Sequence, residues 1–150
     1  MNSHSQFYMD DLQPGMRFSS AEHVIDEAQI KAFATQFDPQ PFHLDNEAAK
    51  ATLFGGLAAS GWHTAAITMR LLVTSGLPLA GGIIGASGEL AWPKPTRPGD
   101  VMHVESEVVS VTPSRSKPDR GMALVRSETL NQKGDVLQLF TVNVVVNRKG

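Results

Sequence analysis

Residues 60–76 read SGWHTAAITMRLLVTSG, and the rest of the chain is organised around this stretch. Ser60 is a favoured N-cap residue, and Gly76 followed by Pro78 predicts the end of a helix. Apolar residues occupy almost every face of this helix, at positions 62, 65, 66, 67, 69, 71, 72 and 73. A helix that is apolar nearly all round is normally buried, and this one is too short to span a bilayer. We therefore expect one long, buried, central helix.

The first turn of this helix has backbone N–H groups that lack partners within the helix. Gly61 carries no side chain that would block access to them. The amide of Gly61 is therefore a candidate site for a developing negative charge. The alternative is that Ser60 simply caps the helix against solvent or the preceding loop.

The composition limits the classes of function. The chain has 150 residues, 41% of them apolar, and a formal net charge of −2, which is ordinary for one globular domain. The mixed charges predict no binding to nucleic acid or to a membrane. The absence of cysteine excludes disulfides, thiol catalysis and cysteine-bound metals. The N-terminus has neither a basic start nor an apolar run, so we expect no signal peptide and a cytoplasmic protein.

The N-terminal half predicts a lead-in, one strand and two helices. Asp26 with Gln29 forms a capping-box pattern before the first helix. Asn46 is the expected cap of the second helix, and Gly55 and Gly56 allow a tight turn after it. The expected elements are an irregular lead-in over 1–15, a strand over 16–25, an amphipathic helix over 27–37 and a short helix over 47–52.

Between these two helices lies the segment DPQPFHLD, residues 38–45. Its two prolines predict a stiff, non-helical loop. The loop carries a carboxylate, Asp38, and an imidazole, His43, which can share proton transfer near neutral pH if the loop bends to bring them together. The alternative is that Asp38 caps a turn and that His43 is a packed, hydrogen-bonded histidine.

The run over residues 33–45 resembles the hydratase signature of the MaoC-like dehydratases, which include the (R)-specific enoyl-CoA hydratases. Gln40 stands where that pattern usually has Asn, which retains the amide on a longer side chain. The positions that match the family are Asp38, Pro41, His43, Asp45, the helix entry at 59–61 and the turn at 97–100.

The second half predicts four strands joined by short loops, over 83–92, 101–109, 122–130 and 136–147. Glycines within 83–92 indicate a bend, or the close approach of another backbone or a ligand. An antiparallel sheet that curves around one buried helix is the α+β hot-dog fold, which the resemblance also implies, as one domain over 1–150. The exposed sheet edge predicts a homodimer or a dimer of dimers.

The resemblance implies a hydro-lyase that reversibly hydrates an enoyl thioester, carried by coenzyme A or by acyl carrier protein, to the (R)-3-hydroxyacyl thioester. Asp38 and His43 would orient one water and transfer protons, and the Gly61 amide would stabilise the enolate oxygen. Neither a cofactor nor a metal is expected, because the histidines lack the spacing of a metal site. The residues expected to contact the substrate are Gln40, Ser60, Trp62 and His63.

Two other classes of function stay open. The hot-dog fold also hosts acyl-CoA thioesterases, but these usually carry a carboxylate on the central helix, and residues 62–75 contain none. A non-catalytic acyl-thioester-binding protein is the second alternative. The candidates for contact with the phosphates of coenzyme A are Arg97, Arg115, Lys117 and Arg120.

Overall fold

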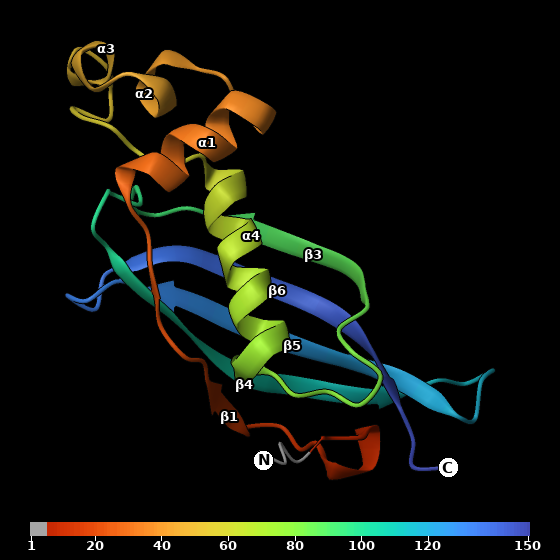
Figure 1. Cartoon of the computed structure of the whole chain (residues 1–150). Coiled ribbons are helices and arrows are strands. Elements are labelled where there is room, and N and C mark those ends of the chain that lie inside the picture. Colours follow the sequence, from red (N-terminus) through yellow and green to blue (C-terminus); the bar gives the residue numbers. More distant parts are fainter. Residues whose placement is uncertain (1–5) are drawn as a thin grey trace.

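A computed structural model describes residues 6–150 as an antiparallel sheet with a long helix lying across one of its faces (Figure 1). The strands are β1 (Arg17–Ser19), β2 (His23–Val24), β3 (Gly85–Ala91), β4 (Val101–Pro113), β5 (Arg120–Leu130) and β6 (Val136–Asn147). Their order is β1-β4-β5-β6-β3, and β2 also pairs with β4. The helices are α1 (Glu27–Phe37), α2 (Pro41–Leu44), α3 (Asn46–Lys50) and α4 (Gly61–Leu71), with a 3-10 turn η1 (Met9–Asp11) and a π turn η2 (Leu72–Gly76).

The core lies between α4 and the centre of the sheet. Val108, Val125 and Val142 pair across β4, β5 and β6, and all three are buried. Ile67 and Leu71 of α4 belong to the same buried cluster. The predicted α+β class, with one sheet against one central helix, is confirmed.

One predicted strand is interrupted, and one of the expected short loops between strands is a longer crossing. The expected first strand over 16–25 is split into β1 and β2 at Ser20 and Ala21, where side-chain hydroxyls take the place of backbone carbonyls as acceptors. The Ser20 hydroxyl accepts from the Val104 amide, and the Ala21 amide donates to the Ser75 hydroxyl. A short loop was expected between β3 and β4, but β3 lies at the other side of the sheet and pairs with β6. The proline-rich segment 92–100 crosses the end of the sheet and does not turn back as a hairpin.

The helix caps agree with the sequence in one case and differ in the other. Asp26 accepts a hydrogen bond from the Gln29 amide at 2.8 Å, as predicted, and so caps α1. The cap of α3 is Asp45, one residue before the expected Asn46, since the Asp45 carboxylate accepts from two amides of the first turn. Asn46 instead donates to the carboxylate of Glu27 and so joins α3 to α1.

The central helix starts at the predicted residue. The Ser60 hydroxyl accepts from the Trp62 amide at 3.2 Å, and the helical stretch ends at Gly76 after the π turn. One face stays exposed in the single chain, including Trp62 at 60% and Val73 at 54%. The face toward the sheet includes Thr64 and Thr68, so the helix is less apolar on its buried side than expected.

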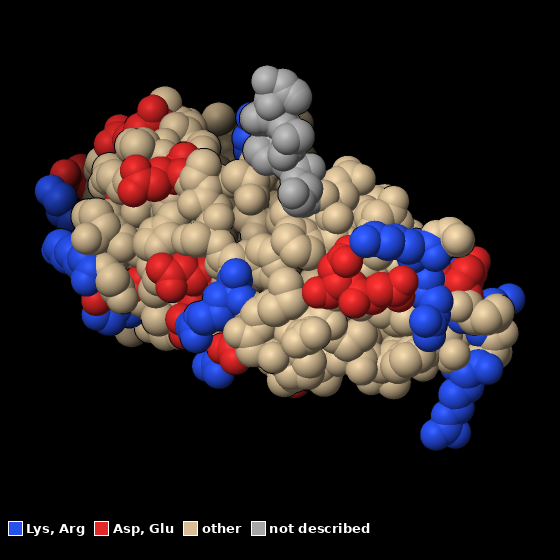
Figure 2. Space-filling view, turned by 90° about the horizontal axis from the view of Figure 1, so that it is seen from below, with Lys and Arg blue, Asp and Glu red and all other residues tan. Residues whose placement is uncertain are grey.

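Charged side chains of both signs are interspersed on the face seen in Figure 2. Near the two ends of the described chain, Arg148 pairs with Asp10 at 3.8 Å and Lys149 with Asp11 at 3.2 Å. Within residues 6–150, no helix is long and apolar enough to cross a membrane. The first five residues of the predicted lead-in lie outside the described part. The rest of the lead-in is irregular except for η1 and a bridge between Phe7 and Leu79.

Replacing Asp45 with alanine is expected to lower the free energy of unfolding by about 1 kcal/mol, because two amides at the start of α3 lose their acceptor. Asp45→Asn is the matched control, since its amide oxygen can still cap the helix. Urea unfolding followed by circular dichroism measures both variants. Equal stability of the alanine and asparagine variants would contradict the capping role.

Candidate active site

The two proline residues do not keep the whole of segment 38–45 out of a helix. Pro41 is the first residue of α2, a single helical turn. Proline is tolerated at that position because its φ suits a helix and no helical hydrogen bond needs its missing N–H. The loop predicted over 38–45 is therefore non-helical only before Pro41 and at Asp45. The short helix turns the chain back and brings His43 toward Asp38.

Asp38 and His43 lie side by side. Asp38 is the C-cap residue of α1, and its Oδ2 atom lies 3.3 Å from Nε2 of His43. On the other side of the ring, Nδ1 of His43 lies 2.7 Å from the carbonyl oxygen of Ala58. A carbonyl oxygen only accepts hydrogen bonds, so Nδ1 carries the proton. In neutral His43, Nε2 therefore presents a lone pair next to the carboxylate.

The surroundings of Asp38 favour its charged form. Partial burial by itself would raise the pKa of this carboxyl. Hydrogen bonds from the Ser60 hydroxyl and the Gln40 amide, together with the nearby His43, outweigh burial and hold the pKa of Asp38 below its ordinary value. Asp38 is therefore a carboxylate near neutral pH, and it accepts a hydrogen bond from Nε2 of Gln40.

The beginning of α4 completes the arrangement. Ser60 is fully buried and its hydroxyl is bonded to the Trp62 amide. The N–H of Gly61 has no hydrogen-bond partner within residues 6–150. A side chain at this position would collide with Trp92, because a Cβ atom on Gly61 would lie 2.8 Å from the indole ring. Only glycine fits here without displacing Trp92.

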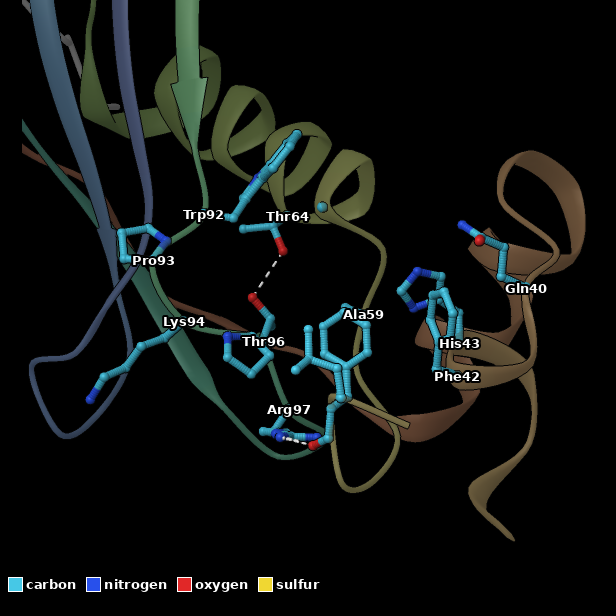
Figure 3. Close-up of a pocket in the computed structure, with 14 residues that line it drawn as sticks. Gln40, Phe42, His43, Ala59, Thr64, Trp92, Pro93, Lys94, Thr96 and Arg97 are labelled. Atoms are coloured by element: carbon cyan, nitrogen blue, oxygen red, sulfur yellow. Dashed lines mark hydrogen bonds between the residues drawn. The ribbon is translucent and has the colours of Figure 1, made fainter. Parts of the chain in front are cut away.

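These groups border a cavity of about 690 Å³ (Figure 3). The close-up shows Gln40, Phe42 and His43 on one side and Trp92, Thr64 and Thr96 on the other. Thr64 and Thr96 are joined by a hydrogen bond of 2.9 Å. The other residues that line the cavity are Leu53, Phe54, Ala59, Gly61, Pro93, Lys94, Pro95 and Arg97.

The structure separates the predicted site residues into two groups. His43, Gly61 and Gln40 line the cavity, and Asp38 lies beside His43 without lining it. Three residues that the sequence assigned to substrate contact do not line it. Ser60 caps the helix, Trp62 lines a separate groove beside β3, and His63 packs against α1.

Sequence reasoning did not single out the wall opposite His43. Trp92 directly follows β3, Thr64 is on α4 and Thr96 lies in a proline-rich turn, and no local pattern marks them as neighbours. The glycines of 83–92 did indicate the close approach of another group. Trp92 is the last residue of that segment, and its ring lies against Gly61.

The basic residues proposed for phosphate contact lie in different places. Arg97 lines the cavity, but its guanidinium donates to the backbone carbonyls of Phe54, Gly56 and Leu57. It thereby holds the loop before α4. The other three candidates lie at the turn between β4 and β5, at the opposite end of the sheet from α1 and α2 (Figure 1).

A model of the MaoC-like domain matches residues 11–129. The chain belongs to the MaoC-like family. A MaoC-like dehydratase from Rhodospirillum rubrum of known structure is 64% identical, with a TM-score of 0.95 that covers 96% of this chain and 99% of that one. The predicted family and hot-dog fold are thus confirmed.

Two further relatives carry names that state a reaction. The 3-hydroxybutyryl-CoA dehydratase of Methylorubrum extorquens is 31% identical over 115 residues, which are 73% of this chain and 69% of the relative. The (R)-hydratase from A. caviae involved in PHA biosynthesis is 27% identical. Its structure gives a TM-score of 0.70 over 92% of this MaoC-like chain and 98% of the hydratase.

His63 is a buried histidine outside the cavity. Its ring stacks on Phe33 with centroids 4.5 Å apart, and its Nδ1 atom has no hydrogen-bond partner in the described part of the chain. Burial away from water, with a further contribution from His23, lowers the pKa of His63 to about 4. His63 is therefore neutral in the folded protein at pH 7.

The buried His63 predicts a loss of stability in acid. The unfolded chain binds a proton on this residue near its ordinary pKa of 6.5 and the folded chain only near 4, so the free energy of unfolding falls as the pH drops from 6.5 to 4. His63→Phe keeps the stacking on Phe33 and is expected to remove on the order of 2 kcal/mol of this loss. Chemical denaturation at pH 4.5, 5.5 and 7.5 measures it. An unchanged pH slope in the variant would overturn this account.

Proposed function

We propose that this MaoC-like protein reversibly hydrates an enoyl thioester to a (R)-3-hydroxyacyl thioester. The observation that carries the proposal is the placement of three groups at one cavity. The Asp38 carboxylate stands 3.3 Å from the His43 imidazole, which lines the cavity, and so does Gly61, whose amide has no partner within residues 6–150. Among residues 6–150, no group of three or more His, Cys, Asp or Glu residues could hold a metal. The reaction proposed uses protein groups and water only.

The Asp38–His43 pair is suited to bind and activate one water molecule. With Nδ1 of His43 protonated toward Ala58, both Nε2 and the Asp38 carboxylate are acceptors on the same side. A single water can donate one hydrogen to each of them. Its oxygen is then directed away from the pair and toward a substrate carbon in the cavity.

The Gly61 amide is suited to bind the thioester oxygen. Addition of water at the β-carbon places negative charge on that oxygen in the enolate. A preorganised N–H at a helix N-terminus stabilises such a charge, and one donor of this kind is typically worth about 3–4 kcal/mol. Gly61 and His43 border one space and Asp38 contacts His43, so the amide and the pair can act on a single substrate.

The protons balance within the pair. The water oxygen bonds to the β-carbon, and the proton released from water goes to His43 or Asp38. That same proton is then transferred to the α-carbon as the enolate collapses, and the second hydrogen of the water stays on the new β-hydroxyl. Because both groups lie on one side of the cavity, water and proton add to the same face of the double bond. The (R) product is inferred from the names of the relatives.

The proposal predicts that the purified protein consumes crotonyl-CoA, with loss of the conjugated-thioester absorbance and formation of 3-hydroxybutyryl-CoA. Asp38→Asn and His43→Gln are each expected to lower kcat by about 10²–10⁴-fold, because each removes one proton-transfer group. Asp45→Asn is the matched control and should keep wild-type turnover. Chiral chromatography identifies the product.

Three results would overturn hydration. The first is wild-type turnover in His43→Gln. The second is release of free coenzyme A detected by a thiol reagent, which would indicate a thioesterase. The third is tight binding of acyl-CoA without turnover of any enoyl-CoA from four to ten carbons, which would indicate a binding protein.

We also propose a homodimer formed through the free edge of β3. In the described chain, β3 pairs with β6 along one side only. The exposed apolar side chains Trp62, Val73 and Ile84 are on or close to the elements at this side. Pairing of two β3 edges would continue the sheet and cover apolar surface.

The dimer predicts a mass of twice 16.2 kDa in analytical ultracentrifugation. Ile84→Glu is expected to shift the protein toward the monomer, because it places a charge next to the β3 edge. Val24→Glu is the matched control, since Val24 is equally exposed, at 57% against 56%, but belongs to β2. Dissociation by both variants alike, or by neither, would contradict the β3 interface.

A further inference from the structure

Two hollows meet at a pair of tryptophans. Trp92 is part of the wall of the active-site cavity. A second hollow of about 480 Å³ runs beside β3 and has Trp62 in its wall. We call it the β3 groove. The two rings contact each other edge to face, with centroids 5.4 Å apart and planes at 80°. The tryptophan pair therefore stands between the cavity and the β3 groove.

The β3 groove has the shape and chemistry of an alkyl site. Gly85, Ala86 and Gly88 contribute almost no side-chain volume to its wall. Phe140 and Val142 of β6 add apolar surface. No charged residue lines the groove within the described part of the chain. The groove is open to solvent in the single chain, and an acyl chain that passed the tryptophan pair would lie against this apolar wall.

Trp92, which is 41% exposed, is held by a hydrogen-bond chain that leads into the core. Its Nε1–H donates to Oε1 of Gln138 at 2.9 Å. The amide nitrogen of Gln138 then donates to the Thr68 hydroxyl at 3.2 Å, and that hydroxyl lies 2.6 Å from the Thr129 hydroxyl. An indole N–H only donates, so it fixes which end of the Gln138 amide faces Trp92.

The position of Gln138 is unusual for an amide. Its side chain is fully buried in β6, where an apolar residue would normally stand. Burial of an amide is costly unless its hydrogen bonds are made, and here both ends have partners. The face of the Trp92 ring also rests on Gly61, which leaves no room for a Cβ atom. The indole is thus fixed at its nitrogen, on one face and at its contact with Trp62.

We propose that Trp92, positioned by Gln138, closes the β3 groove to the active-site cavity and so restricts the substrate to short acyl chains. The proposal rests on the proposed hydration for its substrate class, and the restriction itself concerns binding. Trp92 is the specificity-determining residue. Gln138 is a positioning residue, because it acts through Trp92 and does not line the cavity.

The test compares chain lengths in Trp92→Ala and wild type. Turnover is measured with crotonyl-CoA and 2-octenoyl-CoA, and binding with butanoyl-CoA and octanoyl-CoA by calorimetry. The variant is expected to raise the eight-carbon to four-carbon ratio of kcat/KM, and of affinity, by about tenfold or more. Ala86→Leu added to Trp92→Ala refills the groove and should return both ratios toward wild type.

Gln138→Leu tests the positioning role. It keeps the side-chain volume but removes the acceptor for the indole, so it should raise the same ratio by a smaller factor. In a Trp62→Phe background Trp92 is the single tryptophan, and loss of its hydrogen bond should shift its fluorescence emission. A purely structural role of Gln138 would lower stability and leave the chain-length ratio unchanged.

The outcomes separate this inference from the proposed hydration. If wild type hydrates crotonyl-CoA but Trp92→Ala leaves both ratios unchanged, or lowers four- and eight-carbon activity alike, the gate is overturned. If no enoyl-CoA is hydrated but the ratio of eight-carbon to four-carbon affinity rises in the variant, the restriction by Trp92 is supported and the proposed hydration is overturned. If wild type binds neither acyl-CoA, both fall. Should Trp92→Ala fail to fold, Trp92→Leu keeps apolar filling and is expected to give a smaller shift in the same direction.

Discussion

The site depends on how the backbone before α4 is tied to its neighbours. The carbonyl of Ala58 accepts from Nδ1 of His43, and the Ala58 amide donates to the carbonyl of Phe42 at 3.2 Å. The next amide, that of Ala59, donates to the carbonyl of Thr96 at 2.9 Å. Arg97 holds the loop just before this segment through three carbonyls. The short, irregular segment around Ala58 and Ala59 therefore joins α2, the segment after β3 and the start of α4 in one hydrogen-bonded unit.

Hydrogen bonds and ion pairs also set the charges and proton positions of the groups around the cavity. Asp38 is a carboxylate because hydrogen bonds outweigh its partial burial, and His43 has its proton fixed on the far nitrogen. Arg97 is satisfied by carbonyls, and Lys94 pairs with Asp135 at 3.1 Å. Within the described residues, the pair of acceptors and the Gly61 amide are then the groups at the cavity that lack a fixed partner on their open side. A substrate with a polar thioester and an apolar chain matches this arrangement.

Much of the fold could be predicted from the sequence because its local signals are strong. The central helix, α1 and the last three strands follow from caps, periodicity and β-branched runs, whose causes lie within a few residues. The predictions were wrong where contacts between residues far apart in the sequence determine the local structure. The first strand breaks where Ser20 bonds to Val104 and Ala21 to Ser75, and Pro41 begins a helix that the proline rule alone did not predict. Trp92 was not identified because its role depends on contacts with Gly61 and Gln138, which no spacing along the chain encodes.

The hydrogen bonds around Ala58 also limit local unfolding near the active site. Catalytic loops usually open and close on their own, at a small fraction of the global free energy of unfolding. Here the segment that orients His43 is bonded to the sheet end through Thr96 and to α2 through Phe42. A local fluctuation that released the imidazole would have to break both connections. The active site and the sheet then unfold as one cooperative unit. A mutation that destabilises the core far from the cavity would lower the activity, because it lowers the fraction of molecules that are folded.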